Sequence, residues 1–128
     1  MAKSSSKKLQ GHAEHTQSAA RRGLAGVFKR PIKITMMGAG SGFTPRLLND
    51  VLRIPGQCGG TIGLVDIDTS RLQTMRRLVE RLIGKLGVKN WKVIVSTKRR
   101  EVLPGSDYVV NCIEVSGLEC VRHDNDIP

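Results

Sequence analysis

Three glycines stand at alternate positions, Gly38, Gly40 and Gly42, between an apolar run and a helix start. Glycine lets the backbone turn tightly and lets its N–H groups approach a ligand, and the helix that follows aims its positive end at the same place. A loop of this kind between a strand and a helix is typical of proteins that hold the pyrophosphate of a dinucleotide. The residues that we assign to this contact are Gly38, Ala39, Gly40, Ser41, Gly42 and Phe43.

Asp66 ends the next apolar run along the chain. A carboxylate at the tip of the second strand can accept hydrogen bonds from the ribose hydroxyls of adenosine, and it would repel a 2′-phosphate, so NAD is favoured over NADP. Asp68 is an alternative candidate for this role. Its position just before a predicted helix, however, favours capping of that helix. The alternative for the whole pattern is a glycine-rich turn in another kind of α/β protein. The usual spacing also places a third glycine where Phe43 stands, so the loop is a variant.

Strand and helix patterns alternate around these residues. Apolar runs predict strands at 32–37, 61–65, 91–96 and 107–113. Thr44 as a cap and Pro45 at the first helical position predict a helix that ends near residue 54. A longer amphipathic helix starts at Asp68, Thr69 or Ser70 and stops at Gly87, and a short helical piece spans 98–103. This order predicts an α/β fold with a parallel, Rossmann-like sheet, incomplete because it supplies only the amino-terminal half of a doubly wound domain.

Composition divides the chain into two parts. Of the formal net charge of +10, the first thirty residues contribute seven basic groups against one acidic group, and they hold few large apolar side chains. We expect a disordered basic tail at 1–30 and a truncated NAD-binding domain at 31–128. Three cysteines make no disulfide framework and indicate a cytoplasmic protein. No apolar run is long enough for a membrane helix.

Four segments resemble the NAD- and metal-dependent glycoside hydrolases of family 4: residues 34–44, 64–68, 111–117 and 122–128. Relatives usually carry one more residue in the first of these loops. The resemblance implies that NAD takes hydride from C3 of the sugar, that a divalent metal, typically manganese, acidifies the C2 proton, and that the aglycone leaves by elimination. It also implies that full-length relatives act on small glycosides and can be homo-oligomers.

The resemblance suggests roles for three further residues. Asp124 matches a position proposed as a general acid, with a surface carboxylate at a helix start as the alternative. Glu114 matches the position where phospho-glucosidase members place an arginine, and its charge would repel a sugar phosphate. We therefore expect an unphosphorylated substrate: an α-galactoside, an α-glucoside or a galacturonide. Asn111, at the carboxyl end of the fourth predicted strand, is assigned to cofactor or substrate.

No metal site is predicted in this chain. The family's metal ligands, a Cys and a His, lie downstream of the segment that ends here, and Cys120 with His123 offers only two ligands. We therefore expect the amino-terminal cofactor-binding fragment of a family 4 glycosidase, inactive alone and with exposed strand edges. One alternative is the cofactor fragment of a 2-hydroxyacid dehydrogenase. Another is a small basic nucleic-acid-binding protein, against which the scarcity of aromatic side chains for base stacking argues.

Overall fold

The computed structural model describes residues 30–56, 58–113 and 117–126. The predicted disordered tail lies outside them, apart from Arg30. The elements in chain order are β1 (Ile32–Met37), α2 (Thr44–Val51), β2 (Gly60–Val65), α3 (Thr69–Leu86), β3 (Trp91–Ser96), α4 (Arg99–Val102), β4 (Tyr108–Asn111) and α5 (Gly117–Asp126). The alternation of strands and helices matches the prediction. β4 is shorter than the seven residues expected for it, and α5 was not predicted.

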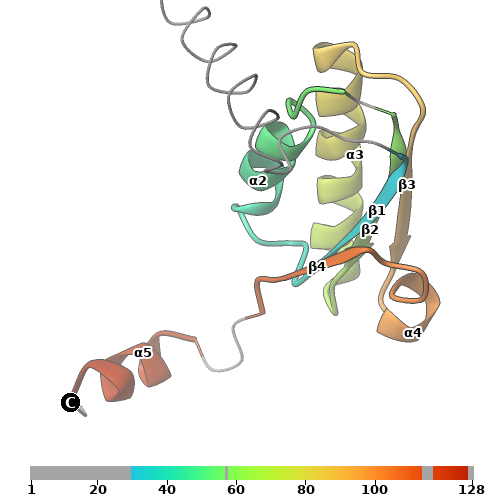
Figure 1. The fold of residues 1–128 in the computed structure, drawn as a ribbon. Coiled ribbons are helices and arrows are strands. Elements are labelled where there is room, and N and C mark those ends of the chain that lie inside the picture. Colours follow the sequence, from blue (N-terminus) through green and yellow to red (C-terminus); the bar gives the residue numbers. More distant parts are fainter. Residues whose placement is uncertain (1–29, 57, 114–116, 127–128) are drawn as a thin grey trace, which may run out of the picture.

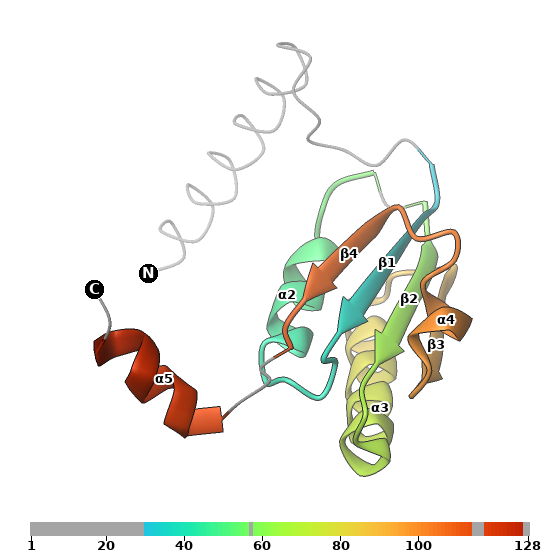
Figure 2. The same cartoon turned by 90° about the horizontal axis from the view of Figure 1, so that it is seen from below.

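The four strands form one parallel sheet in the order β3-β2-β1-β4 (Figures 1 and 2). The chain adds strands outward on one side of β1, and it then returns to place β4 on the other side. The change of direction between β1 and β4 is the first half of the doubly wound order, in which ligands bind beyond the carboxyl ends of the strands. The predicted fold class, a Rossmann-like and incomplete sheet, is confirmed.

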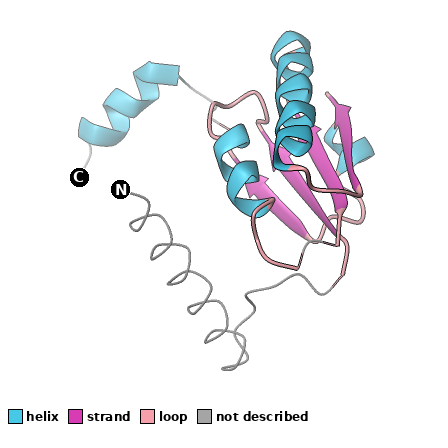
Figure 3. Cartoon of the chain, turned by 90° about the horizontal axis from the view of Figure 1, so that it is seen from above, coloured by secondary structure: helices cyan, strands magenta, loops and turns pink. Residues whose placement is uncertain are grey.

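The main core lies between the sheet and helices α2 and α3, which cover the same face (Figure 3). Alternate strand residues point into it because side chains along a strand face opposite sides. Its buried members are Ile34, Met36, Ala39, Leu48, Leu52, Ile62, Leu64, Leu72, Met75 and Val79. The apolar residues of α3 recur at helical spacing, so the longest helix buries one stripe and leaves its basic stripe in solvent.

Helix α4 lies on the opposite face of the sheet (Figure 2). Val102 is buried there against Gly63 of β2, where an added Cβ would lie 2.4 Å from the Val102 Cγ1 atom. Thr35 lies on this face too, and its hydroxyl is 2.7 Å from the hydroxyl of Ser106. This four-residue helix covers little of the sheet, and Val109 of β4 is 53% exposed. Among the described strands β4 pairs with β1 alone, so it forms one edge of this sheet, as expected for an incomplete domain.

The two longer helices of this core begin in different ways. Asp68 caps α3 by accepting a hydrogen bond from the Arg71 amide at 3.0 Å, and it is one of the three residues predicted as the possible cap. Gly87 ends the helix in the left-handed conformation, as predicted. The predicted cap of α2 is wrong. Phe43 occupies the cap position with helical backbone angles, and Thr44 is the first helical residue. A side chain can cap a helix only from the residue before the first helical turn, where the backbone is extended. Thr44 is already inside the helix, so its hydroxyl does not cap α2. This buried hydroxyl has no hydrogen-bond partner among the described residues.

A charged clamp joins the start of β1 to the start of β4. The two carboxylate oxygens of Asp107 accept hydrogen bonds from Arg30 Nη2 at 2.7 Å and from the Lys33 amide at 2.8 Å. The Asp107 amide donates in turn to the Lys33 carbonyl at 2.8 Å. The hydrogen bond from Arg30, followed by that from the Lys33 backbone, holds the pKa of Asp107 below its ordinary value.

Within the described residues no helix is long and apolar enough to cross a membrane.

Candidate functional site

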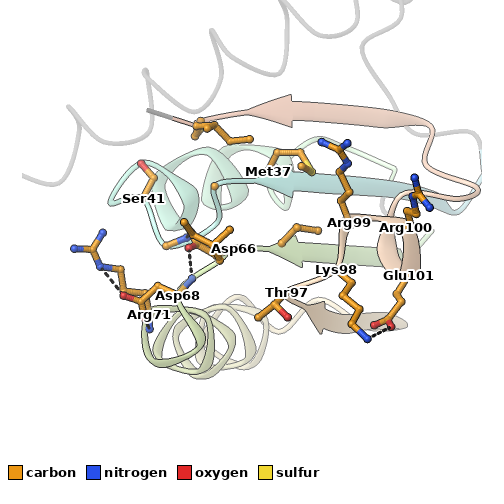
Figure 4. A pocket seen from close by; sticks show the side chains of 16 residues that line it. Met37, Ser41, Asp66, Asp68, Arg71, Thr97, Lys98, Arg99, Arg100 and Glu101 are labelled. Carbon is orange, nitrogen blue, oxygen red and sulfur yellow. Dashed lines mark hydrogen bonds and ion pairs between the residues drawn. The ribbon is translucent and has the colours of Figure 1, made fainter. Parts of the chain in front are cut away.

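A cavity of about 940 Å³ opens at the carboxyl ends of β1, β2 and β4 and extends along α4 (Figure 4). Parts of the chain far apart in sequence line it: the β1–α2 loop, the end of β2, the β3–α4 turn and the residues after β4. It therefore includes the point between β1 and β4 where the strand order reverses. Open α/β sheets place their ligands at this point because the loops on either side diverge there.

The glycine loop forms one wall, and its glycines have different reasons to be there. Gly38 has a φ of +71° and lies against β4, where an added Cβ would be 2.6 Å from the Cys112 carbonyl oxygen. At Gly40 an added Cβ would be 2.8 Å from Asp66 Oδ2 and 3.0 Å from Arg71 Cβ. A Cβ added at Gly42 would meet no atom within 4 Å apart from those of its chain neighbours. Gly38 and Gly40 are required because other atoms of the protein lie too close to leave room for a side chain. This reason does not apply to Gly42.

Asp66 connects this loop to the start of α3. Its Oδ2 atom accepts a hydrogen bond from the Gly40 amide at 2.7 Å, and its Oδ1 atom accepts one from the Asp68 amide at 2.9 Å. The carboxylate expected to hold a ribose is thus bound to an amide expected to hold a pyrophosphate. A carboxylate offers about four lone-pair sites, so each oxygen keeps capacity for a ligand hydroxyl.

Two further groups of side chains complete the cavity. Arg71 contacts the carboxylate of Asp68, with 3.5 Å between Nε and Oδ2. On the other wall the Ser96 hydroxyl donates to Glu101 at 2.5 Å and accepts from the Lys98 amide at 3.0 Å, which holds the β3–α4 turn in place. The basic lining residues are Arg71, Lys98, Arg99 and Arg100. Sequence reasoning missed all four, although three of them follow directly after a predicted strand, at the edge where ligands gather.

The structure brings only part of the predicted site together. Gly38, Gly40, Ser41 and Asp66 line the cavity, whereas Ala39, Gly42, Phe43 and Asn111 do not. Ala39 is buried in the core, and Phe43 is 64% exposed at the start of α2. The Asn111 side chain accepts a hydrogen bond from the Ile113 amide at 3.2 Å. Glu114 lies outside the described residues, and Asp124 lies in α5 with a side chain that is not described.

The donor set fits a dinucleotide and does not fit a metal ion. Gly38, Gly40 and Ser41 line the cavity at the turn before α2 with little or no side chain between backbone and ligand, and Asp66 supplies an acceptor beside them. Across residues 30–56, 58–113 and 117–126, no group of three or more His, Cys, Asp or Glu side chains is placed to hold a metal. Among the described residues, this cavity therefore presents a donor set that suits a dinucleotide.

Sequence comparison agrees with this geometry. The family model described as "Family 4 glycosyl hydrolase" matches residues 33–128, which is most of the chain and all four strands. The chain belongs to the family 4 glycosyl hydrolases. This membership decides in favour of the glycosidase interpretation over the dehydrogenase alternative.

Relatives of known activity or structure support the same assignment. An α-galactosidase of Rhizobium meliloti (strain 1021) is 33% identical over 97 residues, which are 75% of this chain and 20% of that protein. A 6-phospho-β-glucosidase of Thermotoga maritima, solved with NAD and glucose-6-phosphate, is 26% identical with a TM-score of 0.60, covering 77% of this chain and 23% of that one.

A third relative is less similar in sequence, and we use it as support for the fold only. It is a 6-phospho-α-glucosidase from gut microorganisms, solved with NAD and Mn²⁺, with 22% identity, a TM-score of 0.57, and coverage of 73% and 22% of the two chains. This chain spans about a fifth of the length of the relatives that it matches.

Proposed function

We propose that this chain is the NAD-binding part of a family 4 glycosidase that acts on an unphosphorylated glycoside. The observation that carries the proposal is the cavity at the carboxyl ends of the strands, with Gly38, Gly40 and Asp66 in its walls. Its volume of about 940 Å³ is at the upper end of what pockets for small ligands and cofactors occupy. It opens at the strand-order reversal, where this fold binds dinucleotides.

The residues of the chain have separate tasks in this binding mode. Gly38 and Gly40 keep the loop thin enough for the pyrophosphate to approach backbone N–H groups at the start of α2. Asp66 holds the Gly40 amide and offers its remaining lone pairs to the adenosine ribose. Bound NAD would supply the hydride acceptor for oxidation at C3 of the sugar. The chain itself would bind NAD and orient it. Its three cysteines would stay reduced in the cytoplasm, so we propose a cytoplasmic location.

Two arguments favour an unphosphorylated substrate: the negative charge of Glu114 and the similarity to an α-galactosidase. Glu114 stands where phospho-glucosidases of this family place an arginine, and a carboxylate would repel a sugar phosphate. The α-galactosidase is also the more similar relative, at 33% identity against 26% and 22% for the two phospho-glucosidases. An α-galactoside is therefore the first substrate to test.

Hydrolysis requires more than the described residues provide. No group of three potential metal ligands exists among them, and the metal-dependent step implied by the family needs such a group. We propose that the chain binds NAD without hydrolysing a glycoside by itself. With NAD and Mn²⁺ added, 4-nitrophenyl α-galactoside should release no nitrophenol above the rate without protein.

Calorimetric titration of the full chain with NAD tests the proposal directly. Binding should be measurable, and Asp66→Ala should weaken it about tenfold or more, because the loop loses its anchor and the ribose loses an acceptor. Asp50→Ala removes an exposed carboxylate of α2 that does not line the cavity, and it should leave the affinity unchanged. Absence of NAD binding, or equal affinities for Asp66→Ala and the unmodified chain, would reject the proposed site.

A further inference from the structure

Helix α3 carries a row of cations on the face that points away from the sheet. Among its residues five are basic, and Glu80 is the only acidic one. Arg77 and Arg81 lie opposite the stripe that packs against the sheet, and Lys85 follows one turn further on. All three are exposed, and Figure 3 shows α3 on the outside of the domain. Arg77, Arg81 and Lys85 are called the α3 basic row below.

The charges of the α3 basic row are not neutralised within the part of the chain that the structure describes. Arg76 forms an ion pair of 2.9 Å with Glu80, which uses the one carboxylate of the helix. Among the described residues, no member of the row has an ion-pair partner. Like charges one turn apart repel each other and weaken a helix. An anionic partner along this face would offset that repulsion.

The basic amino-terminal segment of the chain enters the fold close to the end of this helix. Ile32, the first residue of β1, pairs with Gly60, and the Gly60 amide donates to the carbonyl of Asn90 at 2.8 Å. Asn90 belongs to the short loop that follows α3. Residues 1–30 hold seven basic groups against one acidic group. The segment and the α3 basic row therefore meet the domain at the amino ends of the strands, whereas the cavity lies at their carboxyl ends.

The α3 basic row presents charge and very little apolar surface. A shallow hollow of about 190 Å³ on this face is lined by Thr74, Arg77, Leu78 and Arg81, and Leu78 is its one large apolar side chain. A protein partner needs a cluster of apolar and aromatic anchors, which this face lacks. Cations about 6 Å apart along a helix suit a linear chain of phosphates instead. Phosphates of a duplex are neutralised by Lys and Arg alone, without the aromatic side chains that base stacking requires.

We propose that the α3 basic row is a second binding surface of this chain, and that it binds the phosphate backbone of a nucleic-acid duplex. The two arginines would each hold a phosphate through paired N–H donors, and Lys85 would add a point charge. Contacts to phosphate carry no sequence information, so binding should not depend on base sequence. The surface is separate from the dinucleotide cavity, because none of the three residues lines it.

Fluorescence anisotropy of a labelled DNA duplex of arbitrary sequence, titrated with the full chain, tests this proposal. The chain should bind the duplex at about 50 mM salt, with an affinity that falls linearly on logarithmic axes as salt rises. The triple variant Arg77→Gln, Arg81→Gln, Lys85→Gln should bind about tenfold more weakly or worse. Its salt slope should be smaller by about two to three, because each phosphate contact contributes roughly 0.9.

A charge-matched control separates this surface from the general positive charge of the chain. The control variant Arg46→Gln, Arg53→Gln, Arg122→Gln removes three exposed cations that lie on other elements, and it should keep most of the salt slope. Equal losses in the two triple variants, or no binding of the duplex by the unmodified chain, would overturn the proposal. Melting temperatures verify that both variants are folded.

Two further measurements identify the partner and separate this proposal from the proposed function. Poly-L-glutamate should displace the duplex only weakly, and displacement as strong as that by unlabelled duplex would assign the surface to acidic proteins and overturn the proposal. The triple variant of the α3 basic row should bind NAD as the unmodified chain does, because the cavity is unchanged. Duplex binding without NAD binding would reject the proposed function and leave this surface in place.

Discussion

The backbone amide of Gly40 donates a hydrogen bond of 2.7 Å to the carboxylate of Asp66. One residue belongs to the loop after β1 and the other to the end of β2, so the bond joins two neighbouring strand ends across the mouth of the cavity. It ties the loop expected to hold the pyrophosphate to the carboxylate expected to hold the ribose.

Gly40 and Gly42 should respond differently to the same substitution. Gly40→Ala places a methyl group 2.8 Å from Asp66 Oδ2 and 3.0 Å from Arg71 Cβ, whereas Gly42→Ala places one in open space. We expect Gly40→Ala to weaken NAD binding about tenfold and to lower the melting temperature, because the loop must move away from Asp66. Gly42→Ala should change neither quantity appreciably. Calorimetry and thermal denaturation measure both, and equal effects of the two variants would contradict this account of the loop.

Gly63 and Gly84 make a second matched pair, for stability. An added Cβ at Gly63 would lie 2.4 Å from Val102 Cγ1 and 2.8 Å from Thr35 Oγ1, in the packed contact between β2 and α4. Gly63→Ala should cost roughly 1 to 3 kcal/mol of the free energy of unfolding. Gly84 lies inside α3, and a Cβ added there would meet no atom within 4 Å beyond its own stretch of helix, so Gly84→Ala should add roughly 0.5 to 1 kcal/mol to the free energy of unfolding. Urea denaturation gives both values, and a stabilised Gly63→Ala protein would show that α4 does not pack as described.

The buried hydroxyl of Thr44 offers a stabilising change. Thr44 is fully buried, and its Oγ1 atom has no hydrogen-bond partner among the described groups. Valine has the same shape without the hydroxyl, so Thr44→Val removes an unsatisfied polar group and should stabilise the fold by about 1 kcal/mol or more. Thr44→Ser, which keeps the hydroxyl and loses the methyl group, should destabilise it. Loss of stability in Thr44→Val, measured by urea denaturation, would mean that the hydroxyl is satisfied after all.

The clamp at Asp107 predicts a dependence of stability on pH. Arg30 and the Lys33 amide lower the pKa of Asp107 in the folded state below the unfolded value of about 3.9. A lowered folded pKa stabilises the protein above the unfolded pKa, and this contribution disappears as the pH falls through the folded pKa. Melting temperatures of the unmodified chain and of Asp107→Asn should therefore differ most at neutral pH and converge in acid. A gap that stays constant between pH 7 and pH 2 would argue against the clamp.

The local features of the fold could be read from the sequence because they depend on neighbouring residues. The apolar spacing of Leu72, Met75 and Val79 predicted α3 and its buried face. Asp68 before that helix and Gly87 after it predicted its ends, because capping and left-handed turns need only local backbone. The order of strands and helices predicted a parallel sheet, and the glycine loop before a helix predicted where a dinucleotide would bind.

The tertiary structure alone decided which of these residues meet. Nothing local in the sequence shows that Asp66 binds the Gly40 amide, that Thr44 turns into the core, or that Arg71 and the basic residues of α4 share one cavity. These contacts depend on strand order and register, which bring together residues far apart in the chain. Periodicity and turn preferences act over a few residues, whereas the packing of helices on both faces of a sheet sets the distances between loops.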